Sequence, residues 1–165
     1  MADVRNSNLF QTIGDIQKIK DVLVVLVKTE WNAAIVDELE RGAVRVLQDY
    51  QLTTKTITVP GAVEIPFTIQ QSWANDHTAS AFIALGCVVR GGTPHFEYVC
   101  QSVTNGITQL NLALPVPVIF GVLTVDTNEQ AQERIGGIHG HKGEEAAITA
   151  IKMIAVNQQL KEENR

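Results

Sequence analysis

The chain alternates between short apolar runs and longer segments whose apolar residues recur at helical spacing. The apolar runs predict four strands, at residues 22–27, 55–59, 79–89 and 116–123. The periodic segments predict helices at residues 32–50, 64–76, 95–114 and 127–135, followed by a last helix that ends near residue 160. Strands that alternate with helices form a parallel sheet with helices on both faces. We therefore expect an α/β sandwich of three layers around a four-stranded parallel sheet.

The first predicted helix shows the pattern clearly. Its apolar stripe consists of Ile35, Leu39, Ala43, Val46, Leu47 and Tyr50. On the opposite face, Asp37 and Arg41 are four residues apart, and we expect them to form an ion pair. This helix should therefore bury one side against the sheet and leave the other in solvent.

One domain is expected to occupy residues 21–160. Residues 1–20 contain scattered apolar side chains that would favour packing on another subunit, so we expect an N-terminal arm there. Residues 161–165 are polar and predict a solvated tail. In parallel sheets of this kind, ligands bind beyond the carboxyl ends of the strands, so functional residues are expected at those ends.

Composition excludes several classes of protein. With 165 residues, 45% hydrophobic and 19% charged, the chain is long and apolar enough for one folded domain. Its net charge of −5 argues against general binding to nucleic acid or to an anionic membrane surface. No apolar run is long enough for a membrane helix, and the N-terminus has no secretory signal pattern. The two cysteines are expected to be reduced thiols, which indicates a cytoplasmic protein.

The loop at residues 90–95 has the pattern of a phosphate site. Gly91 and Gly92 allow the backbone to approach a ligand, and Thr93 adds a hydroxyl donor. The helix predicted to follow would present free N–H groups to an anion. His95, in its first turn, could move a proton near neutral pH. The same pattern also fits an ordinary turn between a strand and a helix, with a solvated histidine.

Three further residues could have either a functional or a structural role, and a fourth is expected to be structural. Trp31 could stack on a planar heterocycle or pack at the rim of the sheet. Glu64 could bind a polyol or an amine, or only complement a helix dipole. Arg134 could bind phosphate or be an exposed helix residue. Phe120, inside the fourth predicted strand, is expected to belong to the core.

No metal site is expected. His139 and His141 form an H-x-H pattern, but a metal ion needs more ligands than these two. Lys142 could contact a substrate or only solvent. Cys87 and Cys100 lie in apolar contexts and are expected to be buried and unreactive. The sequence contains no dinucleotide-binding, Walker A or G-x-S-x-G motif, which argues against those chemistries.

Four motifs in unbroken order closely resemble the lumazine synthase family. They lie at residues 59–66, 84–96, 117–124 and 129–134, and the resemblance extends over residues 21–158. It implies a flavodoxin-like fold and condensation of 5-amino-6-(D-ribitylamino)uracil with 3,4-dihydroxy-2-butanone 4-phosphate. The product is 6,7-dimethyl-8-ribityllumazine, the penultimate compound of riboflavin biosynthesis. The family uses neither a metal nor an organic cofactor.

The resemblance also implies an assembly of identical subunits. Family members form pentamers with sites between adjacent subunits, and some assemble twelve pentamers into an icosahedral cage of 60 subunits. The segment at residues 134–143 has the length found in cage-forming members. Residues 1–20 are expected to add a strand to the sheet of a neighbouring subunit.

Roles of single residues follow from matching positions. His95 matches the family's proton donor, and Gly92, Thr93 and Arg134 match its phosphate site; His95 and Arg134 are thus the candidate catalytic residues. The other matching positions lie along the pyrimidine ring or the ribityl chain: Trp31, Asn32, Ala62, Val63, Glu64, Cys87, Val88, Val89, Phe120 and Lys142. Phe120 is expected to face a neighbouring subunit.

Two departures from the family pattern bear on function. Trp31 stands where most members have phenylalanine, and Cys87 stands where threonine is commoner. The larger indole face leads to the hypothesis that this chain binds riboflavin or the product more tightly than members with phenylalanine do. An alternative is a non-catalytic relative that binds flavin or lumazine, or that serves mainly to form a shell. An assay of lumazine formation distinguishes these alternatives.

Overall fold

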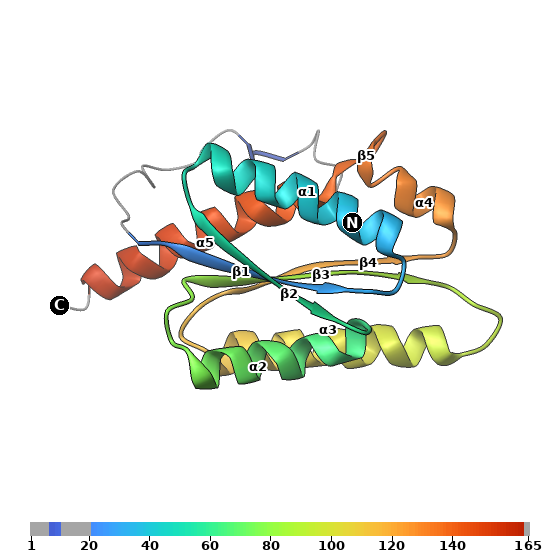
Figure 1. Cartoon of the computed structure of the whole chain (residues 1–165), viewed down its shortest axis with the longest axis horizontal. Coiled ribbons are helices and arrows are strands. Elements are labelled where there is room, and N and C mark those ends of the chain that lie inside the picture. Colours follow the sequence, from blue (N-terminus) through green and yellow to red (C-terminus); the bar gives the residue numbers. More distant parts are fainter. Residues whose placement is uncertain (1–6, 11–20, 164–165) are drawn as a thin grey trace.

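The computed structural model describes residues 7–10 and 21–163. Its centre is a sheet of four parallel strands in the order β2-β1-β3-β4: β1 (Leu23–Thr29), β2 (Thr53–Val59), β3 (Ala81–Val89) and β4 (Val118–Val125). Helices α1 (Ala33–Asp49) and α5 (Lys142–Glu163) cover one face, and α2 (Ile65–Asn75) and α3 (His95–Ala113) cover the other (Figure 1). This arrangement confirms the α/β sandwich with a four-stranded parallel sheet. The strand order is that of flavodoxin-like folds.

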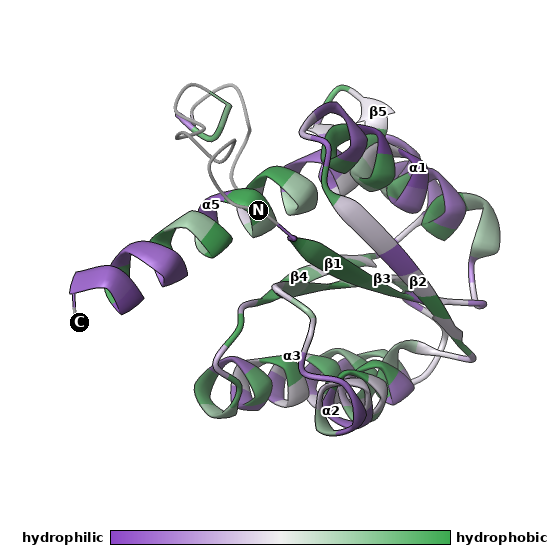
Figure 2. Ribbon diagram, turned by 60° about the vertical axis from the view of Figure 1, so that its left-hand side comes forward, coloured by the Kyte–Doolittle hydropathy of each residue, from purple (hydrophilic) through white to green (hydrophobic). Residues whose placement is uncertain are grey.

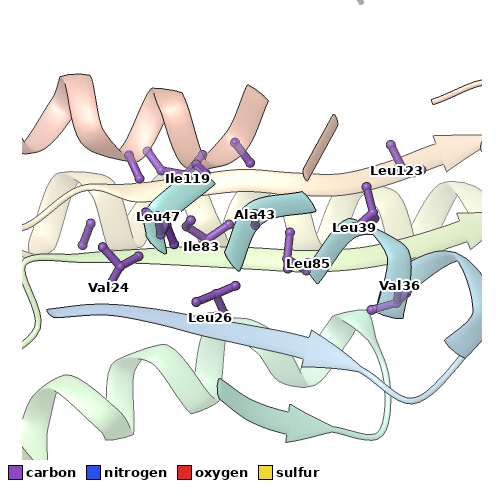
Figure 3. Packing of buried hydrophobic residues seen from close by; sticks show 14 of the residues in the cluster. Val24, Leu26, Val36, Leu39, Ala43, Leu47, Ile83, Leu85, Ile119 and Leu123 are labelled. Atoms are coloured by element: carbon purple, nitrogen blue, oxygen red, sulfur yellow. The ribbon is translucent and has the colours of Figure 1, made fainter. Parts of the chain in front are cut away.

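The two central strands carry the core because they are covered on both faces. Val24 and Leu26 of β1 point toward α1 and α5, and Val25 and Val27 belong to the cluster under α2 and α3. Figure 2 shows hydrophobic colours along β1 and β3, whereas β2 at the edge is partly hydrophilic. Figure 3 shows side chains of α1, including Leu39, directed at the sheet. The continuous apolar runs thus reflect burial on both sides.

Helices α1 and α5 approach each other very closely. A Cβ added to Gly143 would lie 2.0 Å from the carbonyl oxygen of Leu39. A Cβ added to Gly42 would lie 2.1 Å from the His141 ring. Gly143 is therefore required by this packing because the atom in its way is backbone, whereas a side chain at Gly42 would displace the His141 ring just before α5. The two helices bury Ala43, Ala147 and other small residues between them and the sheet.

The segment after β4 differs from the predicted helix at residues 127–135. Helix α4 spans only Asn128–Gln132, and a small antiparallel hairpin follows, with β5 (Ile135–Gly137) and β6 (Gly140–His141). Gly136 and Gly140 have positive φ angles of 114° and 76°, which glycine adopts without strain. The Gly-rich stretch is therefore an ordered turn, and Arg134 lies just past the helix rather than within it.

Two other elements differ in detail from the prediction. Glu64, expected to begin a helix, instead ends a separate 3₁₀ turn, η3 (Ala62–Glu64), and α2 begins at Ile65. Helix α5 continues to Glu163, three residues beyond the expected end, and its last residues are exposed.

The ion pair expected between Asp37 and Arg41 is wrong. Lys28 of β1 donates to Asp37 over 2.9 Å and also pairs with Glu40, because it lies under that face of α1. Arg41 pairs instead with Glu38, one turn away on the same helix. A residue of the preceding strand, which the helical spacing does not reveal, thus competes for the carboxylate.

Most of the expected N-terminal arm lies outside the described residues. Of residues 1–20, only 7–10 are described; residues 9–10 form a turn, and Lys152 of α5 donates to the carbonyl of Asn8 over 3.3 Å. The strand that the arm was expected to add to a neighbour stays a prediction. In the described part of the chain, no helix is both long enough and apolar enough to cross a membrane.

Candidate active site

A cavity of about 560 Å³ opens at the carboxyl ends of β1 and β3, and we call it the first cavity. The chain passes from β1 to β2 on one side and returns to β3 on the other, so the crossover direction changes here. Such a point in a parallel sheet leaves a crevice for ligands. The residues that line it are Thr29, Trp31, Asn32, Gly61, Ala62, Val63, Glu64, Cys87, Val88, Val89, His95 and Val99.

The turn after β1 places Trp31 at this cavity. Asn32 has left-handed backbone angles, φ 59° and ψ 40°, and its side-chain Nδ2 donates to the carbonyl of Cys87 over 2.8 Å. That bond ties the turn to the end of β3. Trp31 is 74% exposed in the isolated chain, so it does not pack at the rim of the sheet. Its ring is available to a ligand.

Glu64 lies opposite Trp31 across the turn after β2. A Cβ added to Gly61 would lie 3.0 Å from Glu64 Oε2 and 3.5 Å from Trp31 Cδ1. The absence of a side chain at Gly61 therefore lets a carboxylate and an indole ring come together. Glu64 is exposed, and its carboxylate can accept hydrogen bonds from hydroxyl groups of a ligand.

The end of β3 forms the floor of the first cavity. Cys87 is buried, whereas Val88 and Val89 are partly exposed. Burial raises the pKa of the Cys87 thiol to about 11, so the thiol is protonated at neutral pH. Cys87 is therefore a wall of the cavity and not a nucleophile. Cys100, expected to be buried, is only partly so.

His95 begins α3 and its side chain lines the first cavity. The preceding residues, 90–94, form what we call the glycine loop, beside a depression of about 370 Å³ that Gly92 and Thr93 line. A histidine and a loop rich in N–H groups thus lie at adjacent openings. This arrangement can hold an anion near a group that transfers protons.

Phe120 and Lys142 line a different cavity, of about 480 Å³, which we call the second cavity. It runs along the edge strand β4 beside α5, and it shares no lining residue with the first cavity. Phe120 is 42% exposed, so its assignment to the core is wrong; it lies on the uncovered edge of the sheet. Lys142 is buried, and its Nζ lies 2.8 Å from both carboxylate oxygens of Glu145.

Arg134 lines none of these three openings. Its Nη1 donates to the carbonyl of Gln130 over 2.6 Å and lies 3.7 Å from the Glu133 carboxylate. The side chain is 20% exposed. A single chain therefore brings Trp31, Glu64, His95 and the other predicted residues of the first cavity together. Gly92 and Thr93 line the neighbouring depression, Phe120 and Lys142 line the second cavity, and Arg134 lines none of the three.

Sequence reasoning did not single out several of the residues that line these cavities. Thr29, Gly61 and Val99 line the first cavity, and Glu145 lines the second. Glu145 lies three residues after Lys142, a spacing that could have indicated their ion pair. Thr29 and Gly61 lie at strand ends, where functional residues were expected, whereas Val99 reaches the cavity from α3.

The two histidines of the H-x-H pattern contact different carboxylates. His139 lies 3.7 Å from Glu133, and His141 lies 3.6 Å from Glu38. Among residues 7–10 and 21–163, no group of three or more His, Cys, Asp or Glu side chains could hold a metal ion. The described part of the chain thus offers no metal centre to the site.

Comparison with known proteins gives a consistent result. The family model for 6,7-dimethyl-8-ribityllumazine synthase matches residues 21–158. A protein of that name from Porphyromonas gingivalis is 48% identical over 142 residues, which cover 84% of this chain and 88% of the relative. Another, from Parabacteroides distasonis, is 45% identical over 148 residues, 88% of this chain and 90% of the relative.

The matched region contains every residue that lines the first cavity and the glycine loop. It also contains Phe120, Arg134 and Lys142. With this coverage and identity, the chain belongs to the 6,7-dimethyl-8-ribityllumazine synthase family.

Proposed function

We propose that this chain condenses 5-amino-6-(D-ribitylamino)uracil with 3,4-dihydroxy-2-butanone 4-phosphate to form 6,7-dimethyl-8-ribityllumazine, the penultimate step of riboflavin biosynthesis. Membership of the family supports the enzymatic reaction. The observation that carries the proposal is the first cavity, where Trp31, Glu64 and His95 meet at the switch point of the sheet.

The uracil substrate fits the chemistry of this cavity. The indole of Trp31 stacks on the pyrimidine ring, which lies along Cys87, Val88 and Val89. The ribityl hydroxyls donate to the carboxylate of Glu64 beside Ala62 and Val63. Asn32 holds the turn that carries Trp31, through its bond to the Cys87 carbonyl. One wall thus binds the ring and another binds the polyol.

The phosphate of the butanone substrate binds at the glycine loop. Backbone N–H groups near Gly92 and the hydroxyl of Thr93 donate to the phosphate oxygens, at the start of α3. Within one chain Arg134 lies away from this loop, so Arg134 of a neighbouring subunit would supply a fork of donors to the same phosphate. The exposed position of His95 next to this loop supports a role in proton transfer.

The reaction proceeds by three proton-coupled steps. The 5-amino group attacks the ketone carbonyl and forms an imine with loss of water. Phosphate then leaves by elimination, and the resulting carbonyl condenses with the nitrogen that bears the ribityl chain, with loss of a second water. The main contribution of the protein is to hold two substrates in contact. His95 moves protons, and Arg134 stabilises the charge on the departing phosphate.

We further propose that the site is completed by a neighbouring subunit. The first and second cavities have no lining residue in common, so Phe120 and Lys142 would act at the site of the adjacent chain. A ring of subunits, each offering its first cavity to one neighbour and its second cavity to the other, follows naturally. The pentamer and the 60-subunit cage are two forms of such an assembly. The cytoplasmic location stays a prediction.

An absorbance assay of lumazine formation with both substrates tests this function. We expect turnover by the wild-type chain, and about 10²- to 10³-fold slower turnover by His95→Gln, as for loss of one acid–base group. Arg134→Ala should lower kcat/KM for the butanone phosphate about 10- to 100-fold, because a charged hydrogen bond is lost. No lumazine from the wild type would favour the non-catalytic alternative. Wild-type rates for Arg134→Ala at low butanone phosphate would contradict the phosphate role.

A further inference from the structure

The glycine loop makes few contacts along its length. A Cβ added to Gly91 or Gly92 would find no other atom within 4 Å, and residues 91–95 are all exposed. A loop with so little packing has no intrinsic reason to keep one shape. Its conformation must therefore be determined at its two ends.

Arg90 lies at the first end and makes contacts in three directions. Its backbone N–H donates to the carbonyl of Val125 over 2.9 Å, and its Nε donates to Asp126 Oδ1 over 2.6 Å. Its Nη1 forms an ion pair with Glu97. The guanidinium carbon also lies 4.1 Å from the centre of the Phe96 ring. Arg90 thus contacts both the segment after β4 and the first turn of α3.

These contacts connect the two ends of the glycine loop. Phe96 and Glu97 lie in the first turn of α3, directly after the loop, and Asp126 follows the neighbouring strand β4. Isolated exposed ion pairs contribute little, but a guanidinium held by two carboxylates and an aromatic ring forms a network with defined geometry. The flat fork of an arginine suits this arrangement, and a lysine ammonium would not reproduce it.

The guanidinium of Arg90 is fully engaged within the network. The pKa of Glu97 is held below its usual range, mainly by its hydrogen bond to Arg90, and the pKa of Arg90 is raised by Glu97 and Asp126. Arg90 and Glu97 are therefore both ionised at neutral pH. With two carboxylates against one guanidinium, Arg90 has little capacity left for a phosphate.

We propose that Arg90 is a positioning residue: it fixes the glycine loop, through Asp126, Glu97 and Phe96, in the shape that binds the phosphate group. The proposal rests on the function proposed above, which places the phosphate at this loop. Arg90 also borders the depression beside the loop, but its guanidinium is occupied by the two carboxylates, so in this proposal it does not bind the phosphate. It keeps the donors of residues 92–93 directed at one point.

The first test compares Arg90→Gln and Arg90→Lys with wild type in steady-state assays. We expect the KM for the butanone phosphate to rise about tenfold in Arg90→Gln, because displaced donors bind the phosphate poorly. The KM for the ribitylaminouracil should stay within about twofold, since the first cavity keeps its walls. Arg90→Lys should retain the defect, because charge alone does not restore the fork. An unchanged KM for the butanone phosphate in both variants would overturn the proposal.

The matched control is Arg41→Gln, which removes another exposed arginine paired with a carboxylate, Glu38 on α1. Arg41 lines neither cavity nor the glycine loop, and both KM values should be those of wild type. An equal rise in the KM for the butanone phosphate in this control would mean that the effect is not local, and would also overturn the proposal.

The variant Asp126→Asn separates positioning from direct binding by the sign of its effect. If Arg90 were a phosphate ligand, loss of a competing carboxylate would free it and lower the KM for the butanone phosphate. If Arg90 positions the loop, the same change loosens the network and raises that KM. Measurement at 0.15 M salt, with a Debye length of about 8 Å, screens the contribution of charges farther away than that. A lower KM in Asp126→Asn would therefore overturn the proposal.

A binding measurement keeps this test separate from the proposed reaction. If the wild type forms no lumazine, the proposed function fails, and titration with inorganic phosphate followed by ³¹P NMR decides the role of Arg90. We expect about tenfold weaker phosphate binding in Arg90→Gln than in Arg41→Gln. Equal dissociation constants would overturn the proposal. If circular dichroism shows that Arg90→Gln is unfolded, Asp126→Asn and Glu97→Gln, which keep the arginine, provide the same comparison.

Discussion

Trp31 is the aromatic side chain that lines the first cavity, and it is 74% exposed there. Its ring offers a larger flat surface than phenylalanine to a heterocycle. We predict that Trp31→Phe weakens riboflavin binding about fivefold, within the range expected for loss of part of an aromatic stacking contact. Quenching of riboflavin fluorescence during titration with the protein measures the dissociation constant.

The second tryptophan provides the control for this prediction. Trp73 lies on α2, makes an edge contact with His77 and does not line the first cavity. Trp73→Phe should therefore bind riboflavin as the wild type does. Equal affinity of Trp31→Phe and wild type would refute the hypothesis that the indole strengthens flavin binding.

At the level of residues, the sequence predicted the site correctly where the residue lies in the segment that follows a strand. Trp31, Glu64 and His95 come just after the ends of strands, so a parallel sheet necessarily brings them to one edge. Phe120 was assigned to the core because it lies inside an apolar strand, but β4 is an edge strand and leaves it 42% exposed. Strand order is a property of the whole sheet, and a local apolar pattern does not contain it.

Among the glycines of the described residues, Gly143 allows the closest approach of two helices, α1 and α5. A Cβ on Gly143 would lie 2.0 Å from the Leu39 carbonyl oxygen, which is backbone and cannot move aside alone. We predict that Gly143→Ala lowers the free energy of unfolding by about 3 kcal/mol, because overpacking outweighs the better helix propensity of alanine. Urea unfolding followed by circular dichroism at one fixed protein concentration measures the change.

Gly91→Ala is the matched control for that measurement. A Cβ at this position meets no atom within 4 Å, so we expect a change below about 0.5 kcal/mol. A Gly143→Ala chain as stable as Gly91→Ala would show that α1 and α5 can separate at no cost.

At the level of elements, the apolar periodicity predicted all four strands of the sheet and the four helices that cover it. It failed between residues 127 and 141, where α4 is short and the β5–β6 hairpin follows. Helix α4 begins at the cap made by Thr127, whose Oγ1 accepts from the Gln130 N–H over 3.3 Å. Helix α4 buries only Ala131, so no apolar stripe defines its length. The hairpin depends on positive φ angles at Gly136 and Gly140, and the presence of glycine permits such angles without requiring them.

At the scale of the whole molecule, a single chain divides the predicted site between two cavities. His95 lines the first and Lys142 the second. If each active site combines the first cavity of one subunit with the second cavity of its neighbour, two damaged chains can form an intact site together. We therefore predict that co-expressed His95→Gln and Lys142→Gln chains regain activity that neither variant has alone. Glutamine at residue 142 can still donate to Glu145, which limits structural damage.

The size of the recovery follows from random assembly. An intact site forms where a chain that keeps His95 has, on the proper side, a neighbour that keeps Lys142. In a closed ring assembled from an equal mixture of the two variants, each condition holds at half of the sites, so about one quarter of the sites are intact. Activity near a quarter of wild type, absent when the two purified variants are only mixed after assembly, would establish a shared site. Activity no greater than the mean of the two variants would contradict it. Light scattering on the same sample gives the mass of the assembly. A mass of five chains excludes the 60-subunit cage, and a mass of one chain excludes a shared site altogether.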